Sequence, residues 1–430
     1  MSATTSTSAI DANAASSPPQ RSLRVGDHAA LWLSLSVGLL VLQSGALIAP
    51  ALGFGQSALV IILGSALGVA VLGAVAAVAA RQGTSAMACL APVLGPCGVK
   101  LPAAANMIQL IGWGAFELMV MAQAAQGVTD RAGVGTAYGL WVVVFAVLVT
   151  ALAYAGPLAF VRRVLRRMGI WLVLASALWL TWRLVTAYDL DWTNRSGDGS
   201  MHAGAALDVV IAMPLSWLPL AGDYARHVQC GSGAGRDRGR AAGWSAAAGY
   251  LVGTVWFHLL GAGYALALGD SAIVPALLAA AGGVWALGLI LFGESDNAMA
   301  DVYSAGVSSE AVAGGGPRLS WRVLLAGAAA GAIALVAGDG SYETFLLLLG
   351  SIFAPLYAVA LTHWAGRTST RPWAALIAWV LGVATYHLLP RWQDSLGATI
   401  PSMAVAALTY GVLAYAVLAR QPSPGREAHQ

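Results

Sequence analysis

The sequence contains very little charge: only 10% of its 430 residues are Asp, Glu, Lys or Arg. A water-soluble domain is normally about 25% charged. Because 58% of the residues are hydrophobic, the chain cannot cover a folded domain with a polar shell. The composition therefore excludes an ordinary soluble protein and indicates that most of the surface faces lipid.

Cysteine is also scarce, with Cys89, Cys97 and Cys230 as the only three. No zinc-type spacing joins them, and we expect free thiols in cytoplasmic loops. The formal net charge is only +3, and no basic run is long enough to indicate nucleic-acid binding. The HExxH and GxSxG motifs of metalloproteases and hydrolases are absent, so an enzyme is not expected.

What the sequence does contain is a series of apolar blocks long enough to cross a bilayer as helices, which takes about 20 residues each. They predict an all-α membrane protein with about twelve spans. The spans are expected at 29–53, 57–80, 101–127, 137–157, 168–188, 204–225, 243–268, 284–307, 321–338, 341–364, 371–390 and 397–419. The short apolar stretch 271–283 is expected to be an extracellular re-entrant or surface helix.

The basic residues give the expected orientation. With the N-terminus inside, the predicted outer loops hold only Arg131, Arg195 and Arg391 of the 22 Lys and Arg residues. This is the bias of the positive-inside rule. Segments 1–28 and 420–430 are expected to be cytoplasmic tails, the first of them disordered. We expect a monomeric, multi-pass protein of the bacterial cytoplasmic (inner) membrane with both termini cytoplasmic.

Two predicted spans carry helix-breaking residues at comparable positions. Span one contains Gln43-Ser44-Gly45 with Pro50 beyond it, and span six has Pro214 and Pro219 on either side of Trp217. A broken helix is tolerated in a bilayer where it is buried or lines a wet cavity. Ordinary proline kinks are the alternative interpretation. Paired breaks favour two inverted five-helix repeats around a midplane site, at 29–188 and 204–364, followed by two added helices at 371–419.

Charged residues deep inside the spans are few, and all of them are acidic. They are Glu117 in span three, Asp208 in span six, and Glu294, Asp296 and Asp301 in span eight. A carboxylate at the bilayer centre costs roughly 3 kcal/mol, and no Lys or Arg lies deep in a span to neutralise these. We therefore expect the acids to bind a cation, to bind donors of a substrate, or to titrate.

Two tryptophans complete the predicted cavity. Trp113 shares a helical face with Glu117, and Trp217 lies at the break of span six. A flat heteroaromatic ring would fit between two indoles, and each stacked pair adds about 0.5–1.5 kcal/mol beyond burial. Gln43, Glu117 and Asp301 would accept hydrogen bonds from an amino-pyrimidine edge or a hydroxymethyl group.

Three stretches resemble the nucleobase:cation symporter-1 family of permeases, and most closely its hydroxymethylpyrimidine permease branch. They are Asn106-Met-Ile-Gln-Leu-Ile-Gly-Trp113 with Glu117, Leu215-Ser-Trp217-Leu-Pro-Leu-Ala-Gly-Asp223-Tyr-Ala-Arg226, and Asp301-Val-Tyr-Ser-Ala-Gly306. The resemblance runs from about residue 28 to about residue 365. It implies a LeuT-like fold and alternating-access transport driven by Na⁺ or H⁺.

The resemblance also implies roles for single residues. Trp113 and Trp217 are similar to the two stacking tryptophans of the family, and Gln43 to the polar residue of its span-one break. Glu117 stands where the family often has Gln, and Asp301 where it often has Asn. By the same resemblance Asp223 is expected to anchor a helix end or a loop.

For the coupling ion, the family pattern points to a possible Na⁺ site. Its members would be carbonyls near Leu39 and Leu42 in span one, with Phe292, Ser295 and Asp296 in span eight. Sodium-coupled relatives have two consecutive hydroxyl residues where this chain has Ser295 and Asp296. This difference leaves proton coupling through Asp296 or Glu294 as the alternative.

The expected function is import of a pyrimidine-type compound, with hydroxymethylpyrimidine, a thiamine precursor, as the first choice. Cytosine, a purine, allantoin or a hydantoin are the alternatives within the same family. No cofactor is expected apart from the co-transported ion, and the expected partners are the small substrate, Na⁺ or H⁺, and the lipid bilayer. A channel or a membrane enzyme is the remote alternative.

Overall fold

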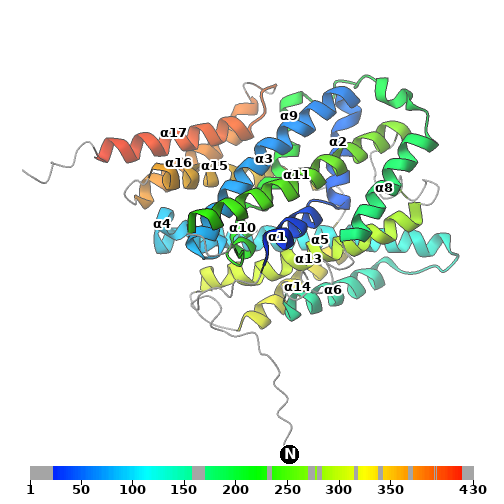
Figure 1. The fold of residues 1–430 in the computed structure, drawn as a ribbon, viewed down its shortest axis with the longest axis horizontal. Coiled ribbons are helices and arrows are strands. Elements are labelled where there is room, and N and C mark those ends of the chain that lie inside the picture. The colour runs from blue at the N-terminus through cyan, green and yellow to red at the C-terminus, as the bar shows by residue number, and fades with distance from the viewer. Residues whose placement is uncertain are drawn as a thin grey trace, which may run out of the picture.

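The computed structural model describes residues 23–156, 170–229, 235–269, 277, 283–313, 318–337, 342–366, 371–391, 393 and 395–418. The described part is a bundle of α-helices, with α16 and α17 at one side of the molecule and α8 toward the other (Figure 1). Eight of the described helices are long and apolar enough to cross a membrane, or nine if one bent pair is counted as a single span. The chain is a multi-pass membrane protein.

The helices follow the predicted spans in order. Those of the first half are α1 (Val25–Leu35), α2 (Leu39–Leu52), α3 (Phe54–Gln82), α4 (Ala86–Gly98), α5 (Lys100–Arg131), α6 (Tyr138–Ala155) and α8 (Ile170–Ala187), followed by the short 3-10 helix η2 (Leu190–Asn194). Those of the second half are α9 (Ala203–Ser216), α10 (Leu218–Ala225), α11 (Gly235–Leu268), α13 (Gly283–Ala313), α14 (Leu319–Val336) and α15 (Tyr342–Gly366). Helices α16 (Pro372–Leu388) and α17 (Thr399–Leu418) follow, with η4 (Leu389–Arg391) between them.

Two segments differ from the predicted organisation. The chain is already ordered at Leu23, whose backbone pairs with His227 and Gln229, so the first helix begins inside the segment expected to be a tail. The loop predicted between spans two and three contains α4, which was not expected. The first 22 residues, the tail 420–430, Cys230 and nearly all of the predicted surface helix 271–283 lie outside the described residues.

Span one is broken, but earlier than predicted. Helix α1 ends at Leu35, α2 starts at Leu39, and the two are bent by 51°. The Ser36 hydroxyl donates to the Leu33 carbonyl at 2.8 Å, which competes with the helical hydrogen bond. Gly38 adopts an extended conformation and begins α2.

The residues predicted to form that break, Gln43-Ser44-Gly45, lie inside α2 instead. Gly45 serves close packing: a Cβ atom on it would lie 2.0 Å from the carbonyl oxygen of His258 on α11. Small residues let helix backbones approach in this way within membranes. Helix α2 ends two residues after Pro50, which has no amide hydrogen to donate to the Ala46 carbonyl one turn earlier.

Span six is broken at Trp217, as predicted. Pro219 lies in the first turn of α10, and the Leu220 amide bonds to the Trp217 carbonyl, not to Ser216 one residue earlier. The Ser216 carbonyl therefore lacks its helical partner. The side chain of Gln109 on α5 donates to it at 3.1 Å, so a neighbouring helix satisfies the group that the break frees.

The helices pack in a pattern that relates the two halves. Span one, formed by α1 and α2, packs against α11, and span six, formed by α9 and α10, packs against α3. In the same way α5 packs against α13. This reciprocal pairing is what a pseudo-twofold axis between two inverted repeats requires. Span one also contacts α13 through α1 and α5 through α2, and span six is joined to α5 by the hydrogen bond from Gln109 to the Ser216 carbonyl.

Candidate functional site

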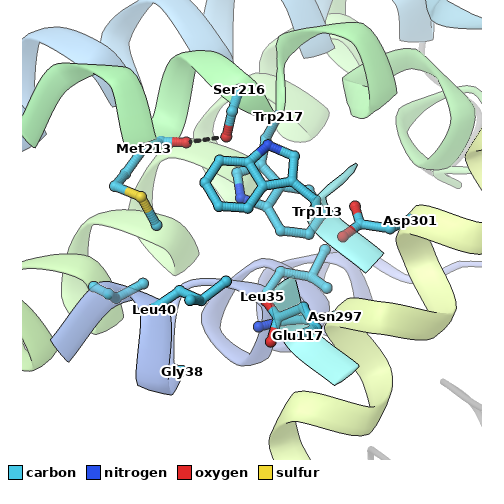
Figure 2. Close-up of a pocket in the computed structure, with 11 residues that line it drawn as sticks. Leu35, Gly38, Leu40, Trp113, Glu117, Met213, Ser216, Trp217, Asn297 and Asp301 are labelled. Carbon is cyan, nitrogen blue, oxygen red and sulfur yellow. Dashed lines mark hydrogen bonds between the residues drawn. The ribbon is translucent and has the colours of Figure 1, made fainter. Parts of the chain in front are cut away.

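A cavity lies where both breaks meet α5 and α13 (Figure 2). It is lined by Leu35, Gly38, Leu40, Val41, Trp113, Glu117, Met213, Ser216, Trp217, Asn297 and Asp301. The space between these side chains measures about 380 Å³, its open end included. No lysine or arginine is among the lining residues. The predicted residues Trp113, Glu117, Trp217 and Asp301 are thus brought together.

The Trp217 indole is held by an aromatic cluster on the α1 side of the cavity. Its ring packs edge-on against Trp32, with centroids 6.2 Å apart and planes at 84°. Trp32 is fully buried and also contacts Tyr224 and Tyr250. The Trp32 indole N–H donates to His28 at 2.9 Å, which fixes its orientation. Trp217 is 8% exposed, so it is rigidly supported from behind and open only toward the cavity.

The Trp113 indole has a separate support on α15. It packs edge-on against Phe345 at 5.2 Å and Tyr342 at 6.0 Å, and contacts Phe116 at 6.3 Å. Tyr342 is itself fixed, because its hydroxyl donates to the Leu40 carbonyl at 2.8 Å. Each indole is therefore pre-positioned before any ligand enters.

Asp301 is the acid that faces the two indoles, with its carboxylate pointing toward them (Figure 2). It is 3% exposed and forms no hydrogen bond or ion pair with the described residues. A buried carboxylate without a partner is costly, by several kcal/mol. Such a group is expected where a ligand supplies the missing donors.

Glu117 and Glu294 form a pair at the edge of the same cavity. Their carboxyl groups lie within hydrogen-bonding reach of each other. A carboxyl–carboxyl hydrogen bond requires that one of the two groups carries a proton. Glu294 also accepts a hydrogen bond from the Leu39 backbone amide, the first amide of α2. The helix N-terminus offers unpaired amides and partial positive charge, so the break in span one supplies a binding site for this acid.

Two other buried acids, Asp208 and Asp223, accept hydrogen bonds from helix N-termini in the same way. Asp208 accepts from the amides of Ala398 at 2.6 Å and Thr399 at 2.8 Å, at the start of α17. Asp223 accepts from the Ala86 amide at 3.1 Å, at the start of α4. These two carboxylates have structural roles away from the cavity, and Asp223 lies at a helix end as expected.

The residues of the predicted sodium site do not converge. The Leu42 carbonyl faces α11, where a Cβ on Gly261 would lie 1.9 Å from it. Ser295 donates to Leu291 within its own helix at 3.0 Å. Asp296 accepts from the Ser34 hydroxyl at 2.6 Å, near the end of α1. The span-one residue facing Asp296 is therefore Ser34, several positions before Leu39 and Leu42.

This shift follows from the position of the break. Because α1 ends at Leu35, the span-one segment opposite α13 is the end of α1. Leu39 faces Glu294 through its amide, and Phe292 lies in α13. Among the described residues, no group of three or more His, Cys, Asp or Glu side chains is arranged to hold a metal ion.

Sequence reasoning missed one polar lining residue and included one that does not line the cavity. Asn297 is 3% exposed and lines the cavity, and its side-chain oxygen has no hydrogen-bond partner among the described residues. Its spacing from Asp301, four residues along α13, could have revealed it. Gln43 lies in α2 and is not among the lining residues. Gly38, Met213 and Ser216 also line the cavity, and no pattern in the sequence had indicated them as site residues.

Comparison with known proteins places the fold. No protein-family model and no curated protein sequence matches the chain. Among solved structures, it is similar to Mhp1, a nucleobase-cation-symport-1 family transporter, in a closed conformation with bromovinylhydantoin bound. The TM-score is 0.77 at 16% identity, covering 95% of both chains. The inward-facing conformation of Mhp1 gives a TM-score of 0.76 at 15% identity, covering 94% of this chain and 92% of that one.

A Na⁺-coupled sialic acid symporter in a substrate-bound, outward-open state is also similar, with a TM-score of 0.70 at 10% identity. The match covers 95% of this chain and 92% of that one. At these identities the likeness shows the fold. The predicted fold class, an all-α membrane protein of the LeuT type, is confirmed.

Proposed function

We propose that this protein is a secondary transporter that imports a small pyrimidine-type compound by alternating access. The observation that supports this best is the position of the cavity. It lies at the junction of two broken spans, between α5 and α13, and is walled by two pre-positioned indoles and buried acids. Discontinuous helices at a midplane cavity between repeats are typical of secondary transporters. Transport, and not catalysis, is therefore the function proposed.

Hydroxymethylpyrimidine is the substrate proposed first. Its flat ring suits the space beside Trp113 and Trp217, and its amino and hydroxymethyl groups would donate to Asp301, Asn297 and Glu117. A hydantoin is the second candidate, because the structurally similar Mhp1 is seen with bromovinylhydantoin bound. Cytosine, purines and allantoin complete the panel of candidate substrates to be tested for uptake.

Uptake into proteoliposomes tests the stacking role. Trp113→Ala and Trp217→Ala should each abolish saturable uptake of labelled hydroxymethylpyrimidine, since each removes one wall of the cavity. Trp373→Ala is the matched control, because Trp373 is 47% exposed at the start of α16 and does not line the cavity. Wild-type uptake by Trp217→Ala would show that the cavity does not bind substrate by stacking.

The proposed coupling ion is a proton, with Na⁺ as the alternative. One contact supports the proton: the Glu117–Glu294 carboxyl pair needs one to form. Replacing Na⁺ by choline at constant pH should leave uptake unchanged, whereas a protonophore should abolish concentrative uptake. Loss of uptake in choline would instead assign the coupling to Na⁺.

A further inference from the structure

The hydrogen-bonding groups of the cavity are unbalanced toward acceptors. The Asp301 carboxyl group accepts no hydrogen bond from the described residues. The side-chain oxygen of Asn297 also has no hydrogen-bond partner among them, although this residue is only 3% exposed. An ionised carboxylate can only accept hydrogen bonds. The Trp113 indole N–H is a buried donor of the same cavity that has no hydrogen-bond partner among the described residues, so acceptors are in excess and not alone. A ligand that satisfies Asp301 and the Asn297 oxygen must bring N–H or O–H donors to that side of the cavity.

The charge of the cavity is unbalanced in the same direction. The carboxyl groups of Glu117, Glu294 and Asp301 meet at this cavity, and the contact between Glu117 and Glu294 requires one proton. The titratable groups facing these acids from other helices are Tyr224 on α10, Tyr250 on α11 and Tyr342 on α15, and none of the three carries positive charge. With no lysine or arginine in the lining, the countercharge is missing from the protein side.

The two indoles favour a cation as well. The face of a tryptophan ring attracts a positive charge, and the attraction grows when both partners are shielded from water. Trp113 and Trp217 are 6% and 8% exposed, and both line the cavity that Asp301 faces. A planar cation could therefore lie against an indole and turn its donor edge toward the carboxylate.

We propose that the cavity selects planar rings with an amidinium-type edge, meaning two N–H donors that share a delocalised positive charge, and rejects rings whose edge carries a carbonyl. A protonated aminopyrimidine has such an edge, with its exocyclic amino group next to a protonated ring nitrogen. Two parallel N–H donors match the two oxygens of Asp301, as an arginine does with a carboxylate. The inference rests on the proposed function, since it concerns the same cavity.

The same chemistry argues against lactam and imide rings, so this inference removes hydantoin from the candidate substrates given above. Uracil and hydantoin alternate N–H groups with carbonyls, so a carbonyl oxygen stands next to the N–H that would face Asp301, and the second carboxylate oxygen is left without a donor. Sites built to bond a polar edge reject analogues with the wrong edge strongly, because buried groups are left unpaired. We expect discrimination of about 10- to 100-fold, which corresponds to about 1.4–2.7 kcal/mol.

Benzamidine and benzamide are the matched probes for this test. Their shapes are nearly the same, but benzamidine is a fixed cation with two donor groups, whereas benzamide is neutral and replaces one of them by a carbonyl. In purified wild-type protein, isothermal titration should give benzamidine an affinity at least 10-fold above that of benzamide. In Asp301→Asn, which offers an amide in place of the carboxylate, this ratio should fall to near one.

Equal affinities in the wild type, tighter binding of benzamide, or binding of neither probe would overturn the inference. An unchanged ratio in Asp301→Asn would also overturn the role of Asp301, and Glu117→Gln serves as the second variant if Asp301→Asn does not fold. The proposed function is judged separately, by proteoliposome uptake of the labelled pyrimidine and purine panel. Uptake of that panel without the benzamidine preference would leave transport standing and remove only the amidinium selectivity.

Discussion

The buried acids divide into two kinds. Substituting an acid of the first kind should lower the free energy of unfolding, whereas substituting one of the second kind should leave it constant or raise it. Asp208 accepts hydrogen bonds from two backbone amides, those of Ala398 and Thr399, which are 2% and 0% exposed as residues. In Asp208→Ala both of these amides lose their acceptor. An orphaned buried donor costs about 1–3 kcal/mol, so two of them should destabilise the fold by about 2–6 kcal/mol.

Asp301 should behave differently because it has no partner among the described residues to lose. Asp301→Asn keeps the volume of the side chain and removes a desolvated charge, so the free energy of unfolding should stay constant or rise. What this variant should lose is stabilisation by ligand. A ligand at 100 times its Kd adds about 2.7 kcal/mol to the wild-type protein, and little of this should remain in Asp301→Asn.

Thermal unfolding in detergent, followed by tryptophan fluorescence, measures both effects. Asp208→Ala should have the lowest melting temperature, Asp208→Asn an intermediate one and the wild type a higher one. Asp301→Asn should melt at or above the wild-type temperature. Asp208→Asn is the intermediate control, since its amide oxygen can accept from one of the two backbone amides. If Asp301→Asn melts as low as Asp208→Ala, Asp301 supports the fold and the division made here is wrong.

The remaining predictions concern packing and accessibility. Gly45→Ala should abolish the yield of folded protein, because its Cβ would lie 2.0 Å from the His258 carbonyl oxygen. The control Gly55→Ala should fold normally, because there is open space around that position. Size-exclusion chromatography measures the yield of both variants. In a variant lacking the third cysteine, maleimide should label exposed Cys97 and not buried Cys89, since burial raises the pKa of the Cys89 thiol to about 11 and disfavours the reactive thiolate. Mass spectrometry after labelling at pH 7 would detect modification at either site, and labelled Cys89 would contradict this.

Several features of the fold followed from the sequence because they depend on local composition. The lipid-facing surface requires long apolar runs, and those runs predicted the order and approximate bounds of the helices from α3 to α17, with the exception of α4. The break at Trp217 could also be predicted, because a proline such as Pro219 has no amide hydrogen to donate within a helix. Trp113 and Glu117 were found together because helical spacing alone puts residues four apart on one face.

The break in span one was placed wrongly because no local signal distinguishes a glycine that ends a helix from one that admits a neighbour. Gly45 lies against the backbone of α11, whereas Gly38 lies against the Glu294 carboxylate at the start of α2. Both functions depend on helices that are distant in the chain. The error displaced the predicted ion site and the assignment of Gln43.

What the sequence by itself determined is that this chain spans a membrane as helices and keeps unneutralised acids and tryptophans inside it. Only the tertiary structure decided which acid does what: Asp208 and Glu294 contact helix N-termini, while Asp301 faces the cavity with no partner among the described residues. The reason is physical. Whether the hydrogen bonds of a buried carboxylate are satisfied depends on the donors around it. Those donors come from helices that only the completed fold brings near.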